Sequence, residues 1–197
     1  LEITVNPSLK RIVVQRKIKD SETAQVRIFG GTLENWDINI EDDVFLAYEQ
    51  ELGNRGSEYG LTGCVTFNDI EIIGLNLIIK DSNCEDAVHF VRVTGSAKRL
   101  SVSNSRQDGV DADYSRLTIE QLDIMRSGND CFDVSLGEYV VVSANLKSCE
   151  DKGISAGEGA FVELTDVLVN DALIGLVSKD GAILEIDHGK VKNAKIC

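Results

Sequence analysis

The chain has 197 residues, of which 43% are hydrophobic and 27% charged, a size that favours one domain with one well-buried core. Its 20 Lys and Arg against 33 Asp and Glu leave a formal net charge of -13, which argues against a nucleic-acid partner, because nucleic-acid binders need a basic surface. No apolar stretch approaches the roughly 20 residues that cross a bilayer, so no membrane span is expected. The 18 Ile and 20 Val against a single Pro favour strands over helices.

Residues 1–58 form the less regular part of the chain. The first 20 residues are expected to form a strand pair that caps the core. Short alternating apolar runs at 26–28 and 36–40 are typical of irregular coils of a repeat protein. Segment 41–56 breaks the pattern, and we expect a loop or a short helix there. This part is therefore interpreted as N-terminal coils with a cap or a loop insertion.

Residues 59–197 carry a repeat with a period of 22. Four apolar residues lie 22 positions apart, and four more follow two positions after them: Val88, Val110, Phe132, Ile154 and Phe90, Ala112, Val134, Ala156. A second row has the same period: Val102, Ile124, Leu146, Leu168. Alternation within each segment and a fixed period between segments predict stacked short strands with one buried face.

About 22 residues suffice for one circuit of three short strands, with successive circuits stacked about 4.8 Å apart. Two other folds do not fit this repeat. Leucine-rich repeats require a recurrent consensus that this sequence lacks, and a β-sandwich would not produce a fixed period. The sequence therefore predicts an all-β, single-stranded right-handed parallel β-helix in one continuous domain. We expect this domain to be part of a larger protein, with flanking domains or a homo-oligomer as its partners. One repeat is less clear, and we expect an inserted loop at 94–98.

Two polar rows follow the same period. The corner row precedes the strands and contains Asp86, Asp108, Asp130 and Lys152; the outward row contains His89, Asp111, Asp133 and Ser155. Corner Asp residues can hydrogen-bond turn backbone, which is a purely structural role, and a lone His is often a solvated surface residue. Carboxylates one or two coils apart also suit acid and base in sugar hydrolysis, and adjacent coils can supply oxygen ligands to calcium.

Three successive segments carry a family resemblance. Segments 107–111, 128–132 and 151–157 resemble the NTDG, DDC and GHGxSxG segments of polygalacturonases, which are right-handed β-helix glycosidases of the pectate-lyase-like superfamily. The resemblance implies that Asp108 and Asp130 occupy two carboxylate positions of that family, while Asn129 and Lys152 stand where the family has Asp and His. It also implies an association with carbohydrate and an extracellular or cell-surface location.

These observations leave three functions open. The first is a carbohydrate-associated domain that binds a polysaccharide along the outward acidic strip, with His89, Asp111, Asp113 and Asp133 as substrate-binding residues. The second is a polysaccharide hydrolase, lyase or epimerase with Asp108 and Asp130 as catalytic residues and Lys152 as a cationic helper. The third is a structural or self-assembling solenoid. No cofactor and no dedicated metal site are expected, with calcium left open as a ligand.

The five cysteines are odd in number and scattered. Cys64, Cys84, Cys131, Cys149 and Cys197 form neither CxxC nor CxxH spacing. Neither a disulfide framework nor a zinc site is therefore indicated, and buried free thiols are expected.

Overall fold

The structure is a computed structural model that describes residues 1–17, 24–43 and 60–197. It contains one short 3-10 helix, η1 (Pro7–Leu9), and 15 strands. The strands are β1 (Glu2–Asn6), β2 (Arg11–Arg16), β3 (Val26–Phe29), β4 (Thr32–Glu34), β5 (Asp37–Asp42), β6 (Gly63–Asn68), β7 (Glu71–Ser82), β8 (Asp86–Val91), β9 (Thr94–Ser105), β10 (Asp108–Asp113), β11 (Arg116–Ser127), β12 (Phe132–Ser135), β13 (Glu138–Gly157), β14 (Phe161–Ser178) and β15 (Ile183–Ile196). Most of the predicted loop or short helix at 41–56 lies outside the described residues.

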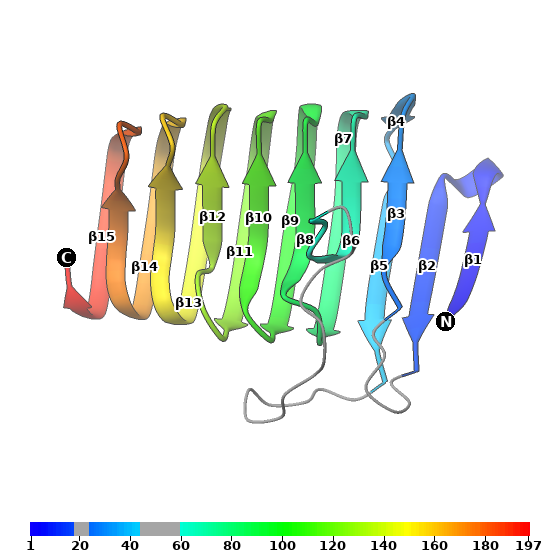
Figure 1. The fold of residues 1–197 in the computed structure, drawn as a ribbon, viewed down its shortest axis with the longest axis horizontal. Helices are drawn as coiled ribbons and strands as arrows, with labels where there is room; N and C mark the ends of the chain where they lie inside the picture. The colour runs from blue at the N-terminus through cyan, green and yellow to red at the C-terminus, as the bar shows by residue number, and fades with distance from the viewer. Residues whose placement is uncertain (18–23, 44–59) are drawn as a thin grey trace.

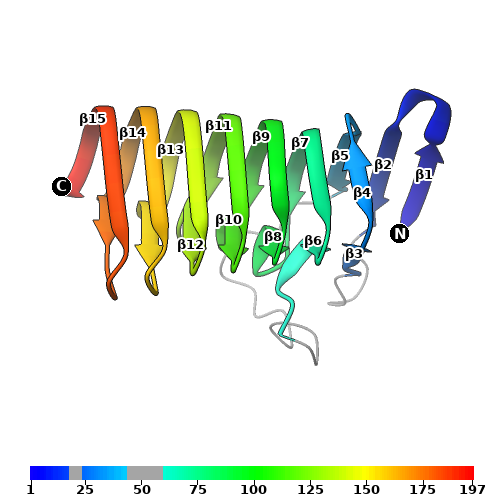
Figure 2. The ribbon, with the colours of Figure 1, turned by 90° about the horizontal axis from the view of Figure 1, so that it is seen from above.

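The strands stack as parallel coils along one axis. One series of neighbours runs β2, β5, β7, β9, β11, β13, β14 and β15, and a second runs β3, β6, β8, β10, β12 and on into β13. The stack has about seven coils. They follow one another in chain order, with the two termini at opposite ends (Figures 1 and 2). The predicted fold class, a right-handed parallel β-helix with about 22 residues per coil, is confirmed. We call the sheet formed by β3, β6, β8, β10 and β12 the short-strand sheet.

The N-terminal strand pair is also confirmed. Strand β1 pairs with β2 in antiparallel register, and β2 continues into the stack by pairing in parallel with β5. The antiparallel β1 is therefore the last strand at this end of the described sheet.

Apolar rows fill the interior of the stack. Val88, Val110, Phe132 and Ile154 are register partners on successive coils, and all four are fully buried. The row two positions later is buried as well, and within it the rings of Phe67 and Phe90 stack with centroids 5.1 Å apart. Because parallel strands in register place the same face inward, each row becomes a continuous ridge of the core.

The second predicted row was wrong at its last member. Leu146 pairs with the fully buried Val169, whereas Leu168 pairs with Asn145 and is only partly buried. The step from β13 to β14 spans 23 residues at these positions, one more than each of the two preceding steps, and the extra residue lies in the turn around Gly159, which has φ of +75°. A one-residue insertion in a strand would turn every side chain to the other face, so the extra residue is accommodated in a turn.

The expected loop at 94–98 was also wrong, because these residues begin strand β9. Gly95 and Ala97 take inward positions beside Leu117 and Ile119, so small side chains hide the repeat in the sequence. Gly95 has φ of +114°, and a Cβ there would lie 1.9 Å from the carbonyl oxygen of Ile72. Glycine is therefore required where these two coils approach closely.

Sharp corners recur at two places in each coil. Non-glycine residues with positive φ follow each other at intervals of 22 or 23 along two rows: Asp69, Arg92, Tyr114, Leu136, Glu158, Asp180 and Asp81, Asn104, Arg126, Ser148, Asp171, Asn193. Asp and Asn occupy half of these positions, and they adopt the left-handed conformation more readily than other non-glycine residues. Part of the acidic composition therefore serves the corners rather than a site.

Four of the five cysteines form disulfides, so the expectation of buried free thiols was wrong. Cys64 pairs with Cys84, and Cys131 pairs with Cys149, at sequence separations of 20 and 18. Because one coil returns the chain to the same corner after about 22 residues, cysteines slightly less than one period apart meet near that corner. Cys197 is the free and exposed thiol.

Replacing Cys131 and Cys149 together with Ala is expected to lower the free energy of unfolding by about 3 kcal/mol, because the unfolded chain loses a cross-link that closes a loop of 18 residues. Urea unfolding of the oxidised protein measures the change, and Cys197→Ala is the control that leaves the midpoint unchanged. Titration of the denatured, unreduced parent should find one thiol per chain. Five thiols would contradict the pairing.

Candidate functional site

The corner row predicted from the sequence is present at the start of the strands of the short-strand sheet. Asp108 Oδ1 accepts hydrogen bonds from the backbone N–H of Asp130 and the side-chain amide of Asn129, both at 2.8 Å. Asp130 Oδ1 in turn accepts from the backbone N–H of Lys152 at 3.0 Å and pairs with its ammonium at 3.2 Å. Asp108 and Asp130 thus each bind the backbone of the next coil, which is the structural role that corner Asp residues can play.

The ammonium of Lys152 is held within this row. Besides Asp130, it contacts the carboxylate of Asp151, its neighbour in the chain. Its side chain is 18% exposed. Lys152 is therefore already neutralised by two carboxylates, which limits the positive charge that it offers to a ligand.

The outward row is more deeply covered than a solvated strip. His89 pairs in register with Asp111, and Asp111 with Asp133. His89 is 4% exposed and Ser155 is fully buried. The reading of His89 as a solvated surface histidine was therefore wrong.

Both ring nitrogens of His89 have polar neighbours. Nδ1 lies 3.0 Å from the hydroxyl of Thr62. Nε2 lies 3.0 Å from Oδ2 of Asp113 and 3.4 Å from Oδ2 of Asp111. The ring is thus oriented with Nε2 toward carboxylates contributed by strand β10.

The carboxylates influence one another strongly. Burial, then the negative charges of Asp86 and Asp113, raises the pKa of Asp111 to about 10. Burial also raises the pKa of Asp108 to about 7, with further contributions from Asp130 and Asp133. Like charges in a poorly solvated region disfavour ionisation, so this face carries either protons or a bound cation.

Asp86 belongs to this group, although only its membership of the corner row was foreseen. Asp86 is 2% exposed; the side chain of Thr62 hydrogen-bonds its carboxyl group, and Oδ2 has no hydrogen-bond partner among the described residues. Donor atoms of Asp86, His89 and Asp111 lie within 4.8 Å of one another. No pattern in the sequence indicated this approach, because residues three apart on a regular strand point to opposite faces.

An exposed border adjoins the acidic face. The side chains of Asp111 and Asp113 are 23% and 30% exposed, and Tyr114, which follows at the corner of the coil, is 60% exposed. Asp133 is half-buried, and its Oδ1 is buried without a hydrogen-bond partner within the described part of the chain. The border therefore offers partly exposed oxygen acceptors on Asp111 and Asp113, followed in the chain by the exposed Tyr114, which was not anticipated from the sequence.

Among the described residues, no helix has the length and apolar character required to span a membrane. The chain matches no protein-family model, no curated protein and no solved structure.

Proposed function

We propose that the chain is a carbohydrate-associated domain that binds a polysaccharide across the outer face of the short-strand sheet. The observation that carries this proposal is that Asp111, Asp113 and Asp133 lie on adjacent coils of one sheet, and that the exposed Tyr114 follows Asp113 in the chain. Carboxylates accept hydrogen bonds from sugar hydroxyls, and an aromatic ring offers a flat apolar surface to a sugar.

Regular stacking suits a polymeric ligand. Neighbouring coils present comparable rows at intervals of about 4.8 Å, so a chain lying along the axis meets repeated contacts. The formal net charge of -13 disfavours polyuronates, which favours a neutral glycan. The resemblance of segments 107–111, 128–132 and 151–157 to polygalacturonases supports membership of the pectate-lyase-like superfamily. The two disulfides support an oxidising, extracellular setting.

Affinity electrophoresis in gels containing a neutral glucan, a neutral galactan or polygalacturonate, with chelator present, tests this function. We expect retardation by at least one neutral polymer and none by polygalacturonate. Tyr114→Ala should weaken retention about fivefold through loss of ring contact. Asp133→Asn should weaken it about tenfold, because a charge-assisted hydrogen bond is lost.

Asp166→Asn is the matched control, since Asp166 is an exposed carboxylate on β14 whose side chain is 69% exposed. It should leave retention unchanged. Equal migration of the parent in all gels would count against glycan binding and favour a purely structural solenoid. Retention that survives both Tyr114→Ala and Asp133→Asn would place the binding surface elsewhere.

A catalytic function is the second candidate, because burial raises the pKa of Asp108 to about 7, which suits a general acid near neutral pH. Asp130 and Lys152 would then serve as the second carboxylate and the cationic helper. Release of reducing ends from any of the same polymers, abolished in Asp108→Asn, would favour this alternative.

A further inference from the structure

The most unusual chemical feature of the molecule is the buried carboxyl group of Asp86 at the start of β8. Asp86 is 2% exposed, and the side chain of Thr62 hydrogen-bonds its carboxyl group, but Oδ2 has no hydrogen-bond partner within the described residues. Buried polar atoms without a partner are rare, and an ionised one is costly unless a cation or a proton compensates it. Burial of the Asp86 carboxyl group therefore calls for either a proton or a bound cation.

Two further donor groups converge on the same point. His89 lies on the same strand, and Asp111 lies opposite His89 on β10. The donor atoms of the three side chains lie within 4.8 Å of one another, a spacing that allows all three to bind one ion. Asp113 Oδ2, at 3.0 Å from His89 Nε2, supplies a fourth donor at the edge of the group.

Thr62 orients the imidazole for this role. Its hydroxyl lies 3.0 Å from Nδ1 of His89. When the Nδ1–H donates to that oxygen, the lone pair of Nε2 faces Asp111 and Asp113. A histidine that binds a metal ion commonly donates its other ring N–H to an oxygen in this way.

We propose that Asp86, His89 and Asp111 bind a divalent first-row transition-metal ion of the zinc type, with Asp113 or water completing the coordination. The nitrogen donor favours such an ion over calcium and magnesium, which prefer oxygen ligands alone. The partly exposed side chains of Asp111 and Asp113 leave a side by which an ion can enter. The site requires no glycan, and it goes beyond the proposed function.

A proton-sharing group is the competing explanation. In it, the carboxyl groups of Asp86 and Asp111 keep protons, because burial raises the pKa of both. Such a group satisfies the same charges without an ion. The metal site predicts that the chelator-treated protein binds one metal ion per chain, whereas the proton-sharing group predicts no stoichiometric binding.

Isothermal titration of the chelator-treated full chain with Zn²⁺ at pH 7 provides the test. We expect one equivalent to bind, and the thermal midpoint to rise by about 5–10 °C at a hundredfold excess over the dissociation constant. Titration with Co²⁺ should give a visible absorption spectrum that reports nitrogen and oxygen ligands. Asp86→Asn and His89→Gln should each weaken binding by at least about tenfold.

His188→Gln is the matched control, because His188 forms an exposed pair with Asp166 at 3.8 Å and offers the same residue types without burial. It should bind Zn²⁺ as the parent does. Circular dichroism of each metal-free variant establishes that it is folded. Absence of stoichiometric binding by the folded parent, or binding lost in His188→Gln but kept in Asp86→Asn and His89→Gln, would overturn the proposal and leave the proton-sharing group.

Glycan retention is measured in the presence of chelator, and its test variants are Tyr114→Ala and Asp133→Asn. Metal binding is measured in the absence of glycan, and its test variants are Asp86→Asn and His89→Gln. A failure of one proposal is thus distinguishable from a failure of the other.

Discussion

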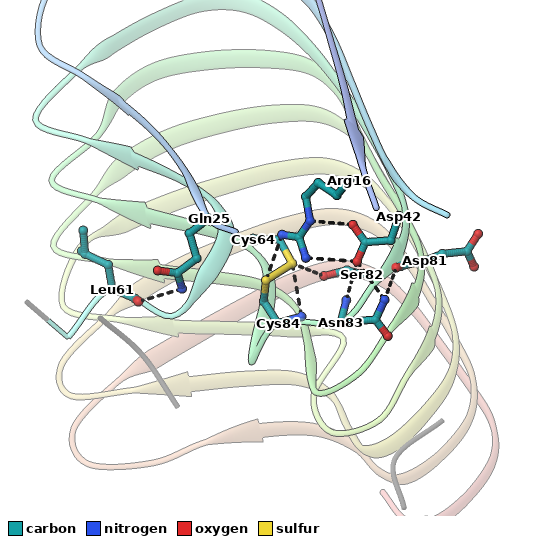
Figure 3. Close-up of a disulfide and its surroundings, with 9 residues drawn as sticks. All are labelled: Arg16, Gln25, Asp42, Leu61, Cys64, Asp81, Ser82, Asn83 and Cys84. Carbon is teal, nitrogen blue, oxygen red and sulfur yellow. Dashed lines mark hydrogen bonds and ion pairs between the residues drawn. A yellow bond between two sulfur atoms is a disulfide. The ribbon is translucent and has the colours of Figure 1, made fainter. Parts of the chain in front are cut away.

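Replacing Asp42 with Ala is expected to lower the free energy of unfolding by about 3–5 kcal/mol, because it leaves the guanidinium of Arg16 buried without a counter-charge. Arg16 Nε lies 2.6 Å from Asp42 Oδ1, and the two residues are 2% and 3% exposed. Figure 3 shows this pair beside the Cys64–Cys84 disulfide. Asp42 Oδ2 also accepts hydrogen bonds from the backbone and side-chain nitrogens of Asn83, at 3.0 and 2.8 Å.

The pair joins distant segments at the N-terminal end of the stack. Arg16 ends β2, Asp42 ends β5, and a second nitrogen of the guanidinium lies 3.0 Å from the sulfur of Cys84. Burial lowers the pKa of Arg16 and raises that of Asp42, while their mutual attraction opposes both shifts. The energetic penalty of the Asp42→Ala change therefore arises from the charge left behind rather than from the lost attraction alone.

Urea unfolding followed by circular dichroism measures this effect. Glu138→Ala breaks the exposed pair with Arg116 and should cost less than about 1 kcal/mol. The double variant Arg16→Leu with Asp42→Leu removes both charges and should recover most of the loss. A cost for Asp42→Ala no larger than that for Glu138→Ala would contradict the assignment of a buried ion pair.

Asp108 alone is expected to lower the stability of the metal-free protein by about 2–4 kcal/mol as the pH rises from 4 to 7. An unfolded Asp has an ordinary pKa of about 3.9, whereas the pKa of Asp108 in the folded chain is raised to about 7. Between these values the folded carboxyl keeps a proton that the unfolded one has lost, so stability falls by up to about 1.4 kcal/mol per pH unit. Partial exposure of Asp108 reduces the total.

Asp108→Asn tests the origin of this slope. An Asn at 108 still presents Oδ1 to the backbone N–H of Asp130 and to the amide of Asn129, so the corner should keep its structure. The variant should lose the part of the fall between pH 4 and 7 that Asp108 causes, whereas the part caused by the raised pKa of Asp111 should remain in both proteins. Above pH 7 the slope should continue in both proteins, because burial and neighbouring charges raise the pKa of Asp111 to about 10.

Urea midpoints measured in chelator at several pH values provide the comparison. Stability that rises from pH 4 to 7 in the parent would contradict the raised pKa of Asp108. An identical slope in the parent and in Asp108→Asn would assign the effect to other carboxyl groups.

The architecture could be predicted from the sequence because the same pattern of apolar residues recurs at a fixed interval along the chain. Each coil contacts the coils before and after it, so one inward position, such as that of Val88 and Val110, must be apolar again 22 residues later. The predictions for residues 94–98 and for Leu168 were wrong, because the apolar repeat is weak at the first place and shifted by one residue at the second. Gly95 and Ala97 are too small to mark an inward row, and the extra residue near Gly159 displaced the register of Leu168.

The candidate site could be predicted only in outline. Register alone places His89, Asp111 and Asp133 on one face of adjacent coils, and the sequence showed that alignment. It did not distinguish an exposed side chain from a covered one, and His89 proved to be 4% exposed. Asp108 accepts a hydrogen bond from the backbone of the next coil, and this bond depends on the distance between the two coils at that corner, which the residue pattern does not specify.

By itself, the sequence determined the repeat, the strand class and the inward and outward rows, because these follow from periods of 2 and 22 along the chain. Only the tertiary structure decided which side chains lose water and which cysteines meet. The pairing of Cys131 with Cys149, the burial of Arg16 with Asp42, and the convergence of Asp86 on His89 all join residues through space. Their energies depend on distance and solvation, and these quantities exist only once the coils are stacked.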